Sequence, residues 1–335
     1  MTRITLDALE GSLQLAKPFH ISGHVFDTVD VLTVTVSDGK HSGVGEAAGV
    51  YYMGDDLAHM RSALAGARSA IEAGPTREDL RSILPPGGAR NAVDAALWDL
   101  EAKKSGQPVW QLAGLREPKP IVTTFTIGAD TPEMMAVTAR SYKQARSIKM
   151  KLTGDLDLDI ARVQAVRAAR SDVWLGVDGN QGFTRSDLPR LVEALVAASV
   201  SLLEQPLPRG QEAELENFKS PVPIAGDESL LSLADLAAAP GRFDVVNIKL
   251  DKCGGLTEGL LMAAEARRLG LVVMVGTMVG TSLATAPGFV LGQVCDLADL
   301  DGPTFLAADR EPSVRYENGM LFAGPEVWGA PTGAA

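Results

Sequence analysis

Five charged residues recur at nearly even intervals in the second half of the chain, each where a short apolar run ends. They are Lys151, Asp178, Glu204, Asp227 and Lys249, and successive members are 27, 26, 23 and 22 residues apart. The carboxyl ends of neighbouring strands in a βα barrel meet at one mouth, so this spacing predicts five charges around one pocket. Because an isolated charge is costly to bury, we expect these groups to be paired or to bind an ion.

The three acids, Asp178, Glu204 and Asp227, would come from adjacent strands, with no His or Cys among them. Carboxylate oxygens suit Mg²⁺ or Mn²⁺ and leave coordination positions for water and a bidentate substrate carboxylate. We therefore predict one Mg²⁺ ion per subunit, for which Mn²⁺ can substitute. Helix capping or pairing with a lysine would explain any single acid, but it explains three acids in register poorly.

The lysines suggest proton transfer. Lys149 and Lys151 alternate along one predicted strand, so their side chains face the same way. Their mutual repulsion and a nearby divalent cation are expected to lower an ammonium pKa toward the working pH, which would make a usable base. Lys249 lies three strands further round and would approach the opposite face of a bound substrate, and two such bases permit inversion at carbon. The alternative role for these lysines is to act as counter-ions for the acids.

The elements that would position these residues form a repeating pattern after residue 121. Short β-branched apolar runs alternate there with amphipathic stretches, such as 156–170 and 188–199, which is typical of βα units around a parallel sheet. The apolar runs predict eight strands at a spacing of roughly 20 to 27 residues, which favours a closed barrel. The eight predicted strands are Ile121–Gly128, Ile148–Leu152, Trp174–Asp178, Ser201–Glu204, Pro223–Asp227, Val245–Leu250, Val272–Met278 and Val294–Asp301.

The first third of the chain is predicted to be a small α+β unit. It opens with an antiparallel hairpin over 27–46 and contains a helix over 89–104, which Gly106 and Pro108 follow. We predict a capping domain over 1–115 and a barrel over 116–304. A tail over 305–335, with a short hairpin at 315–323, is expected to pack back on the capping domain.

Composition narrows the partners. The net charge of −11 argues against nucleic acid and anionic membranes, so a small-molecule partner fits better, and a homo-oligomer is compatible with the sequence. Cys253 and Cys295 form no disulfide framework, and the N-terminus lacks a secretory pattern, so the cytoplasm is the expected compartment. The four histidines all lie within the first 59 residues, which disfavours histidine-ligated barrel hydrolases and a Ser-His-Asp triad.

Several short segments resemble the muconate-lactonizing-enzyme subgroup of the enolase superfamily. They are KMK (149–151), VDGNQGF (177–183), EQP (204–206), GDES (226–229) and NIKLDKCGG (247–255). The resemblance implies an α/β fold, a modified (β/α)₇β barrel with an α+β capping domain, and Mg²⁺ on the three acids. It also implies that Lys151 and Lys249 are the bases that form and quench an enolate, and that Lys149 supports Lys151 and the substrate carboxylate. Asn180 and Glu228 would stand behind the metal ligands.

The segment Asp299-Leu-Asp-Gly-Pro resembles the Asp-x-Asp signature of dipeptide epimerases. This implies that Asp299 and Asp301 hold the ammonium group of a dipeptide with a free N-terminus, whose other end carries the metal-bound carboxylate. By the same resemblance Thr126 and Thr277 would contact the substrate.

The chain departs from the family's Ala-Glu epimerases in an early loop over 18–28. Those enzymes carry an arginine there, whereas His24 is the candidate basic residue in this chain. A second loop over 49–56 supplies two tyrosines, a methionine and two acids. An anionic second residue is therefore disfavoured, and hydrophobic, aromatic and cationic dipeptides remain open.

The prediction is thus an isomerase, a Mg²⁺-dependent epimerase that inverts the α-carbon of the C-terminal residue of a dipeptide by two-lysine 1,1-proton transfer. The alternatives on the same scaffold are a muconate cycloisomerase, an o-succinylbenzoate synthase and an N-acyl amino acid racemase, some of which need only one lysine. A non-catalytic metal-binding scaffold is a third alternative. It gives no chemical reason to keep both bases and all three ligands.

Overall fold

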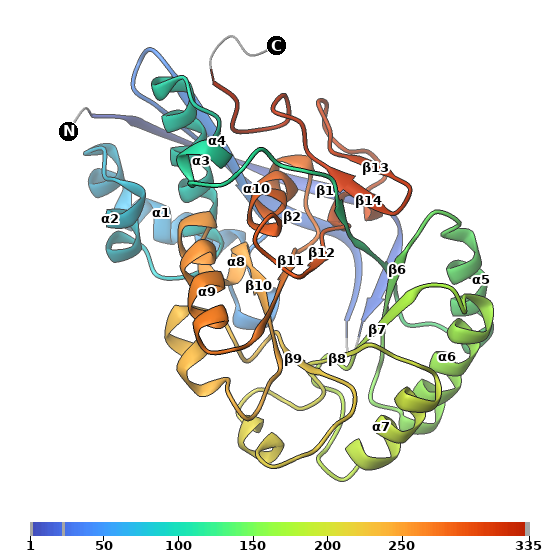
Figure 1. Cartoon of the computed structure of the whole chain (residues 1–335). Coiled ribbons are helices and arrows are strands. Elements are labelled where there is room, and N and C mark those ends of the chain that lie inside the picture. Colours follow the sequence, from blue (N-terminus) through green and yellow to red (C-terminus); the bar gives the residue numbers. More distant parts are fainter. Residues whose placement is uncertain (1–2, 22–23, 332–335) are drawn as a thin grey trace.

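The computed structural model describes residues 3–21 and 24–331. Its centre is an eight-stranded parallel sheet that curls into a barrel, in the order of the chain (Figure 1). The strands are β5 (Thr124–Ile127), β6 (Ser147–Lys151), β7 (Trp174–Asp178), β8 (Leu202–Glu204), β9 (Ile224–Gly226), β10 (Val245–Lys249), β11 (Val272–Gly276) and β12 (Leu297–Asp299). The predicted modified TIM barrel is therefore confirmed.

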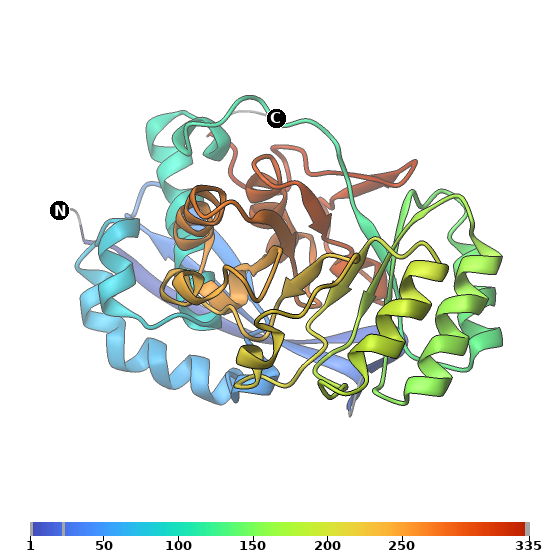
Figure 2. The same ribbon diagram turned by 60° about the horizontal axis from the view of Figure 1, so that its bottom comes forward.

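Seven connections link these strands, and five of them contain α-helices. These are α5 (Pro132–Ser141), α6 (Leu156–Ala169), α7 (Leu188–Ala197), the pair α8 (Leu250–Cys253) and α9 (Leu256–Arg268), and α10 (Ser282–Gly292). The connections after β8 and β9 hold only 3₁₀-helices, over Glu212–Leu215 and Leu233–Ala238. Figure 2 shows the green and yellow helices α5–α7 on the side of the barrel opposite the blue helices of the capping domain.

Side chains join the first and last strands of the barrel. In the described part of the chain the backbone ladder runs from β5 to β12 without pairing these two strands to each other. Instead, Thr123 Oγ1 accepts a hydrogen bond from Leu300 N at 2.8 Å, and the Thr124 hydroxyl donates to the Asp299 carboxylate. The carboxyl end of β12 thus closes the barrel through side-chain contacts.

The prediction of one strand over 121–128 is wrong. The chain forms β4 (Ile121–Val122), which pairs antiparallel with β14 (Met320–Phe322), and then the separate barrel strand β5. Thr123 lies between them and is fully buried, and its hydroxyl oxygen accepts the hydrogen bond from Leu300 N. The two halves of the apolar run therefore have different partners, a division that the hydrophobic pattern does not show.

The capping domain is a three-stranded antiparallel sheet covered by helices. Its strands are β1 (Thr5–Ile21), β2 (His24–Ser37) and β3 (Ser42–Ala47), and its helices are α1 (Leu57–Glu72), α2 (Arg77–Ile83), α3 (Gly88–Ser105) and α4 (Val109–Leu112). The hairpin predicted over 27–46 is present as β2–β3. The long hairpin β1–β2 extends from the cap to the end of the barrel. There the ring centroid of Phe19 lies 4.5 Å from that of Phe305, which follows β12.

Helix α3 connects the cap sheet to the barrel. On one side it packs so closely on β3 that a Cβ on Gly45 would lie 2.2 Å from Ala92 O. On the other side the Asp94 carboxylate accepts hydrogen bonds from the backbone N (3.1 Å) and the hydroxyl (2.5 Å) of Thr257, in the first turn of α9. The cap is therefore seated on the barrel by buried polar contacts.

The tail forms the predicted hairpin, β13 (Arg315–Glu317) with β14, and then returns to the cap. There Trp328 Nε1 donates to Val44 O at 3.0 Å. The domain boundaries at residues 115 and 304 remain predictions. Among the described residues no helix combines the length and the apolar character that crossing a bilayer requires.

Candidate active site

Asp178, Glu204 and Asp227 lie together at the carboxyl end of the barrel. Asp178 and Glu204 end β7 and β8, and Asp227 directly follows β9. Each offers one carboxylate oxygen, these oxygens all lie within 4.8 Å of one another, and the three side chains are at most 1% exposed. Three buried carboxylates with no nitrogen or sulfur donor among them fit a hard divalent cation.

Lysines surround these acids. Lys151 Nζ lies 2.6 Å from Asp178 Oδ2 on one side, and Lys249 Nζ lies 2.6 Å from Asp227 Oδ2 on the other. Lys149 Nζ lies 3.1 Å from Glu204 Oε2. The structure therefore brings together all five residues of the regularly spaced series, with a lysine at each side of the carboxylate group.

The carboxylates around Lys149 raise its pKa. Burial alone would lower this pKa, but the charges of Asp299, Glu204 and Asp178 outweigh burial and hold it well above the usual value. The pKa of Lys249 is raised in the same way, chiefly by Asp227 and Glu204 against the effect of burial. The predicted lowering of an ammonium pKa depends on a bound divalent cation as well as on the repulsion between Lys149 and Lys151, so it remains a prediction.

Asn180 and Glu228 lie beside the three clustered acids, where the sequence analysis expects them. Asn180 N donates to Asp178 Oδ1 at 2.9 Å, and Asn180 Nδ2 donates to Glu228 Oε1 at 3.5 Å. Asn180 has a φ of +41°, a conformation that is uncommon for residues other than glycine and that turns the backbone toward Asp178. Their functional roles remain predictions.

Three residues that hold the acids in place were given no role by the sequence analysis. Gln205 Oε1 accepts from Asp227 N at 3.0 Å, and Asn247 Nδ2 donates to Glu204 Oε1 at 2.8 Å. Lys252 Nζ donates to Asp227 Oδ1 at 2.6 Å. The strand period could have identified Asn247, because it lies two residues before Lys249 and so shares its face.

Asp299 and Asp301 end up in a network with Lys149. The Lys149 ammonium forms an ion pair with Asp299, and Asp301 Oδ2 accepts from Thr126 N at 2.6 Å. The Thr126 hydroxyl lies 3.4 Å from both carboxylates. Burial, followed by the charge of Asp299, raises the pKa of Asp301 to about 7. Binding of a substrate ammonium by these acids remains a prediction.

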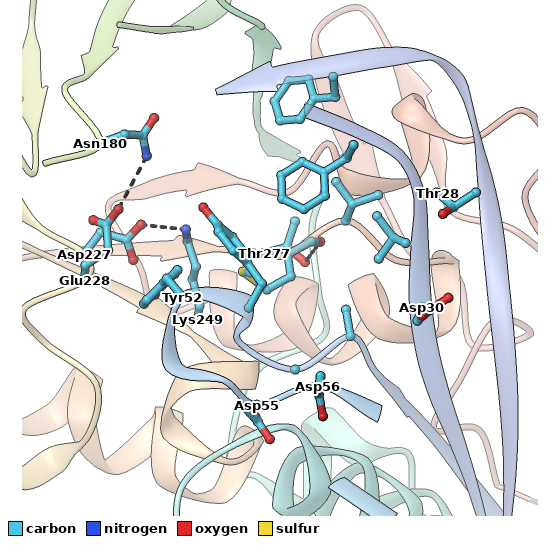
Figure 3. A pocket seen from close by; sticks show the side chains of 18 of the residues that line it. Thr28, Asp30, Tyr52, Asp55, Asp56, Asn180, Asp227, Glu228, Lys249 and Thr277 are labelled. Carbon is cyan, nitrogen blue, oxygen red and sulfur yellow. Dashed lines mark hydrogen bonds and ion pairs between the residues drawn. The ribbon is translucent and has the colours of Figure 1, made fainter. Parts of the chain in front are cut away.

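A cavity of about 310 Å³ lies between the barrel mouth and the cap (Figure 3). The barrel contributes catalytic candidates and Thr277, whose hydroxyl donates to Met278 O at 2.9 Å. The cap contributes an aromatic and polar wall that includes Phe19, Phe26, Thr28, Asp30, Tyr51 and Tyr52. His24 begins β2, but its side chain lies outside the described part of the chain, so its predicted substrate contact is untested.

Two family models match the chain. Residues 3–114 match the mandelate racemase / muconate lactonizing enzyme N-terminal domain, and residues 133–325 match the enolase C-terminal domain-like family. The first match corresponds to the cap and the second to most of the barrel and part of the tail.

Individual relatives match over nearly the full length. The L-Ala-D/L-Glu epimerase of Escherichia coli (strain K12) is 38% identical over 317 residues, which cover 95% of this chain and 99% of that one. An enolase-family protein from Agrobacterium tumefaciens with homology to dipeptide epimerases, solved with sodium and L-Ala-L-Glu, is 41% identical with a TM-score of 0.93, covering 97% and 100%. The dipeptide epimerase from Enterococcus faecalis V583, solved with Mg and L-Leu-L-Tyr, is 28% identical with a TM-score of 0.90, covering 98% of both chains.

Proposed function

The chain belongs to the mandelate racemase/muconate lactonizing enzyme family of the enolase superfamily, and we propose that it is a Mg²⁺-dependent dipeptide epimerase, an isomerase. The observation that carries this proposal is the placement of Lys151 and Lys249 on either side of Asp178, Glu204 and Asp227. The dipeptide epimerases among its relatives support the same activity, and one of them was solved with Mg.

In the proposed reaction the terminal carboxylate of the dipeptide lies at the three acids. Mg²⁺ held there would supply positive charge that stabilises the negative charge developing on the substrate carboxylate. Lys151 Nζ then removes the α-proton from one face, and the Lys249 ammonium donates a proton to the opposite face. In the reverse direction the two lysines exchange roles. General acid–base catalysis of this kind contributes about 10²- to 10⁴-fold in rate.

The ammonium end of the dipeptide is proposed to lie near Asp299 and Asp301. In the network of Asp299, Asp301 and Lys149, two carboxylates share one cation. A second positive charge would therefore give each carboxylate a counter-ion. A free N-terminus supplies that charge, whereas an N-acylated substrate does not. This favours a dipeptide over an N-acyl amino acid.

We propose that the inverted residue carries a large apolar or aromatic side chain. With the carboxylate at the acids and the α-carbon between two lysines, the side chain must extend toward the cap, where Phe19, Phe26 and Val29 line the cavity. In the described part of the chain the cations lining this cavity are Lys151 and Lys249, which the reaction uses. An acidic side chain would therefore lack a counter-ion among them.

Exchange of the α-hydrogen in D₂O tests the proposal. With Mg²⁺, the wild-type protein should incorporate deuterium at the α-carbon of L-Ala-L-Phe and of its epimer L-Ala-D-Phe. Its kcat/KM should be higher for L-Ala-L-Phe than for L-Ala-L-Glu. Lys151→Ala and Lys249→Ala should each abolish epimerisation while one of them retains exchange from a single face. If both variants epimerise like the wild type, the two-lysine mechanism is wrong.

A double variant separates the epimerase from its rivals. Asp299→Asn combined with Asp301→Asn should raise the KM for L-Ala-L-Phe at least about tenfold, because a charge-assisted contact is lost. The same variant should leave the KM for N-acetyl-L-Phe nearly unchanged, because that substrate has no ammonium group, although kcat should fall for both substrates since Asp299 also pairs with Lys149. The opposite pattern would favour an N-acyl amino acid racemase.

A further inference from the structure

The cavity contains a buried hydroxyl group without a partner. Tyr52 Oη is shielded from solvent and forms no hydrogen bond within the described residues. Nearly all buried polar groups in native proteins are hydrogen-bonded, and leaving one unsatisfied is destabilising. Tyr52 lines the cavity together with Asp227, Glu228 and Lys249 (Figure 3). This hydroxyl therefore lies where a bound molecule could satisfy it.

The loop that carries Tyr52 is fixed at both ends. At its start the Asp251 carboxylate accepts hydrogen bonds from Ala48 N and Gly49 N, both at 3.0 Å. At its end Asp55 Oδ2 accepts from Gly88 N at 2.7 Å. Gly49 has a φ of +73°, and a Cβ there would lie 2.1 Å from Asp55 O, so only glycine permits this tight closure.

The position of Tyr52 is fixed from the catalytic side as well. Asp251 lies two residues after Lys249, within the single turn α8. The same short segment therefore places the catalytic lysine at the acids and holds the loop above them. The ring of Tyr52 also packs edge-on against that of Tyr51, with ring centroids 5.2 Å apart. The hydroxyl is thus held in place before any ligand arrives.

We propose that the Tyr52 hydroxyl is a substrate-binding group that donates a hydrogen bond to the terminal carboxylate of the dipeptide. This inference rests on the proposed function. Burial and the neighbouring Asp227 and Glu228 raise the pKa of the Tyr52 phenol, so it remains a neutral donor.

The chemistry of the site selects the acceptor. Two of the nearby protein carboxylates already accept from lysines and amides: Asp227 from Lys249 and Lys252, and Glu204 from Lys149 and Asn247. Glu228 Oε2 has no partner among the described residues, so it does not accept from the Tyr52 hydroxyl either. The substrate brings a new anion to these acids, and its carboxylate offers more lone pairs than a metal ion can use. A phenol donor on the cap side would take one of them.

Tyr52→Phe removes only the hydroxyl and gives three independent readouts. The variant without ligand should melt at the same temperature as the wild type or higher, because no protein hydrogen bond is lost. Mg²⁺ alone should raise the melting temperature of both proteins equally. The KM for L-Ala-L-Phe should rise about tenfold, as expected for the loss of one hydrogen bond to a charged group, with a smaller change in kcat.

Tyr142→Phe is the matched control for stability. The Tyr142 hydroxyl does donate a hydrogen bond, to Thr126 O at 3.0 Å, so this variant should melt at a lower temperature than the wild type. The proposal is overturned if Tyr52→Phe melts lower in the same way, if it weakens the response to Mg²⁺, or if it leaves the KM unchanged. A weakened Mg²⁺ response would assign the hydroxyl to a metal-bound water instead. If the wild type exchanges no dipeptide hydrogen, the proposed function fails, whereas the melting comparison of the ligand-free proteins stands apart from it.

Discussion

Lys252 holds Asp227 through two different oxygens. Its ammonium donates to the backbone oxygen at 2.5 Å and to Oδ1 at 2.6 Å, while Lys249 takes Oδ2 of the same carboxylate at 2.6 Å. Both ends of the carboxylate are therefore occupied by lysines, and its backbone is fixed by one of them. Lys252 is thus a positioning residue for an acid of the metal-binding group.

Replacing Lys252 by Met should loosen Asp227 and weaken metal binding. Loss of a group that orients a ligand typically costs about 10- to 100-fold in metal affinity. Breaking a buried ion pair also destabilises a protein by about 3 to 5 kcal/mol. Calorimetric titration with Mg²⁺ and urea unfolding would measure the two effects. Lys219→Met, at an exposed position, is the control and should change neither. Unaltered Mg²⁺ affinity in Lys252→Met would contradict the positioning role.

Removal of one carboxylate should abolish stabilisation by Mg²⁺. At a hundredfold excess over its Kd, a ligand stabilises the folded protein by about 2.7 kcal/mol. Glu204→Gln should lose this gain, and EDTA should remove it from the wild type. Burial, followed by the charge of Asp178, raises the pKa of Glu204 to about 7. At pH 8 this carboxyl is mostly ionised, and its burial then destabilises the metal-free folded protein. The metal-free Gln variant should therefore be at least as stable as the wild type in thermal melts at pH 8.

Asp251 should make stability depend on pH. Burial raises the pKa of its carboxyl to about 7, although hydrogen bonds from Gly49 and Ala48 act in the opposite direction. In the unfolded chain the carboxyl loses its proton near pH 4, so its contribution to stability falls as pH rises from about 4 to 7. Three pKa units correspond to a loss of at most about 4 kcal/mol.

Asp251→Asn separates this charge from the hydrogen bonds. The Asn oxygen can still accept from both backbone N–H groups, so the variant should lose the decline in stability while keeping the loop in place. Asp251→Ala should be less stable at every pH, because both donors lose their acceptor. Urea unfolding at pH 5 and pH 8 measures the difference, and an equal pH dependence in wild type and Asp251→Asn would show that this carboxyl does not contribute.

Adding a cation to the cap wall should change substrate preference. Thr28 lines the cavity at a distance from the acids and is exposed (Figure 3). In Thr28→Lys the ratio of kcat/KM for L-Ala-L-Glu to kcat/KM for L-Ala-L-Phe should rise at least about tenfold. The reason is that an ion pair between the new lysine and the glutamate side chain, in a site partly shielded from water, is strong enough to favour the acidic substrate by that factor. Thr28→Leu controls for side-chain size and should leave the ratio low. A ratio that the lysine does not raise would contradict the position proposed for the side chain.

The placement of the three clustered acids and of the two lysines beside them could be predicted from the sequence because one rule places them. Each lies at the end of a parallel strand, and the barrel brings such ends together whatever the exact strand boundaries are. The fold class followed from the same periodicity, and the structure confirms it. The 17-residue strand β1 escaped prediction because it is far longer than an ordinary strand and because Gly11 and Pro18 interrupt its apolar pattern.

The partners of Lys149 could not be predicted in the same way. Asp299 lies 150 residues further along the chain, and the two residues meet only because the sheet curls until β12 reaches β5. Spacing along the sequence contains no measure of that curvature. Among the three acids that raise the pKa of Lys149, Asp299 has the largest effect. Likewise, the sequence does not show that the buried Tyr52 hydroxyl lacks a hydrogen-bond partner among the described residues, because that depends on the three-dimensional structure.

The side-chain seam between β5 and β12 has a consequence for folding kinetics. The contact of Thr124 with Asp299 spans 175 residues, whereas Asp178 and Glu204 pair across neighbouring strands. Contacts between distant residues carry the larger loop-closure entropy and slow folding. The acids proposed to bind the metal can therefore assemble early, while Asp299 reaches its position only when the barrel closes. Catalytic competence would accordingly appear after metal affinity in a refolding time course.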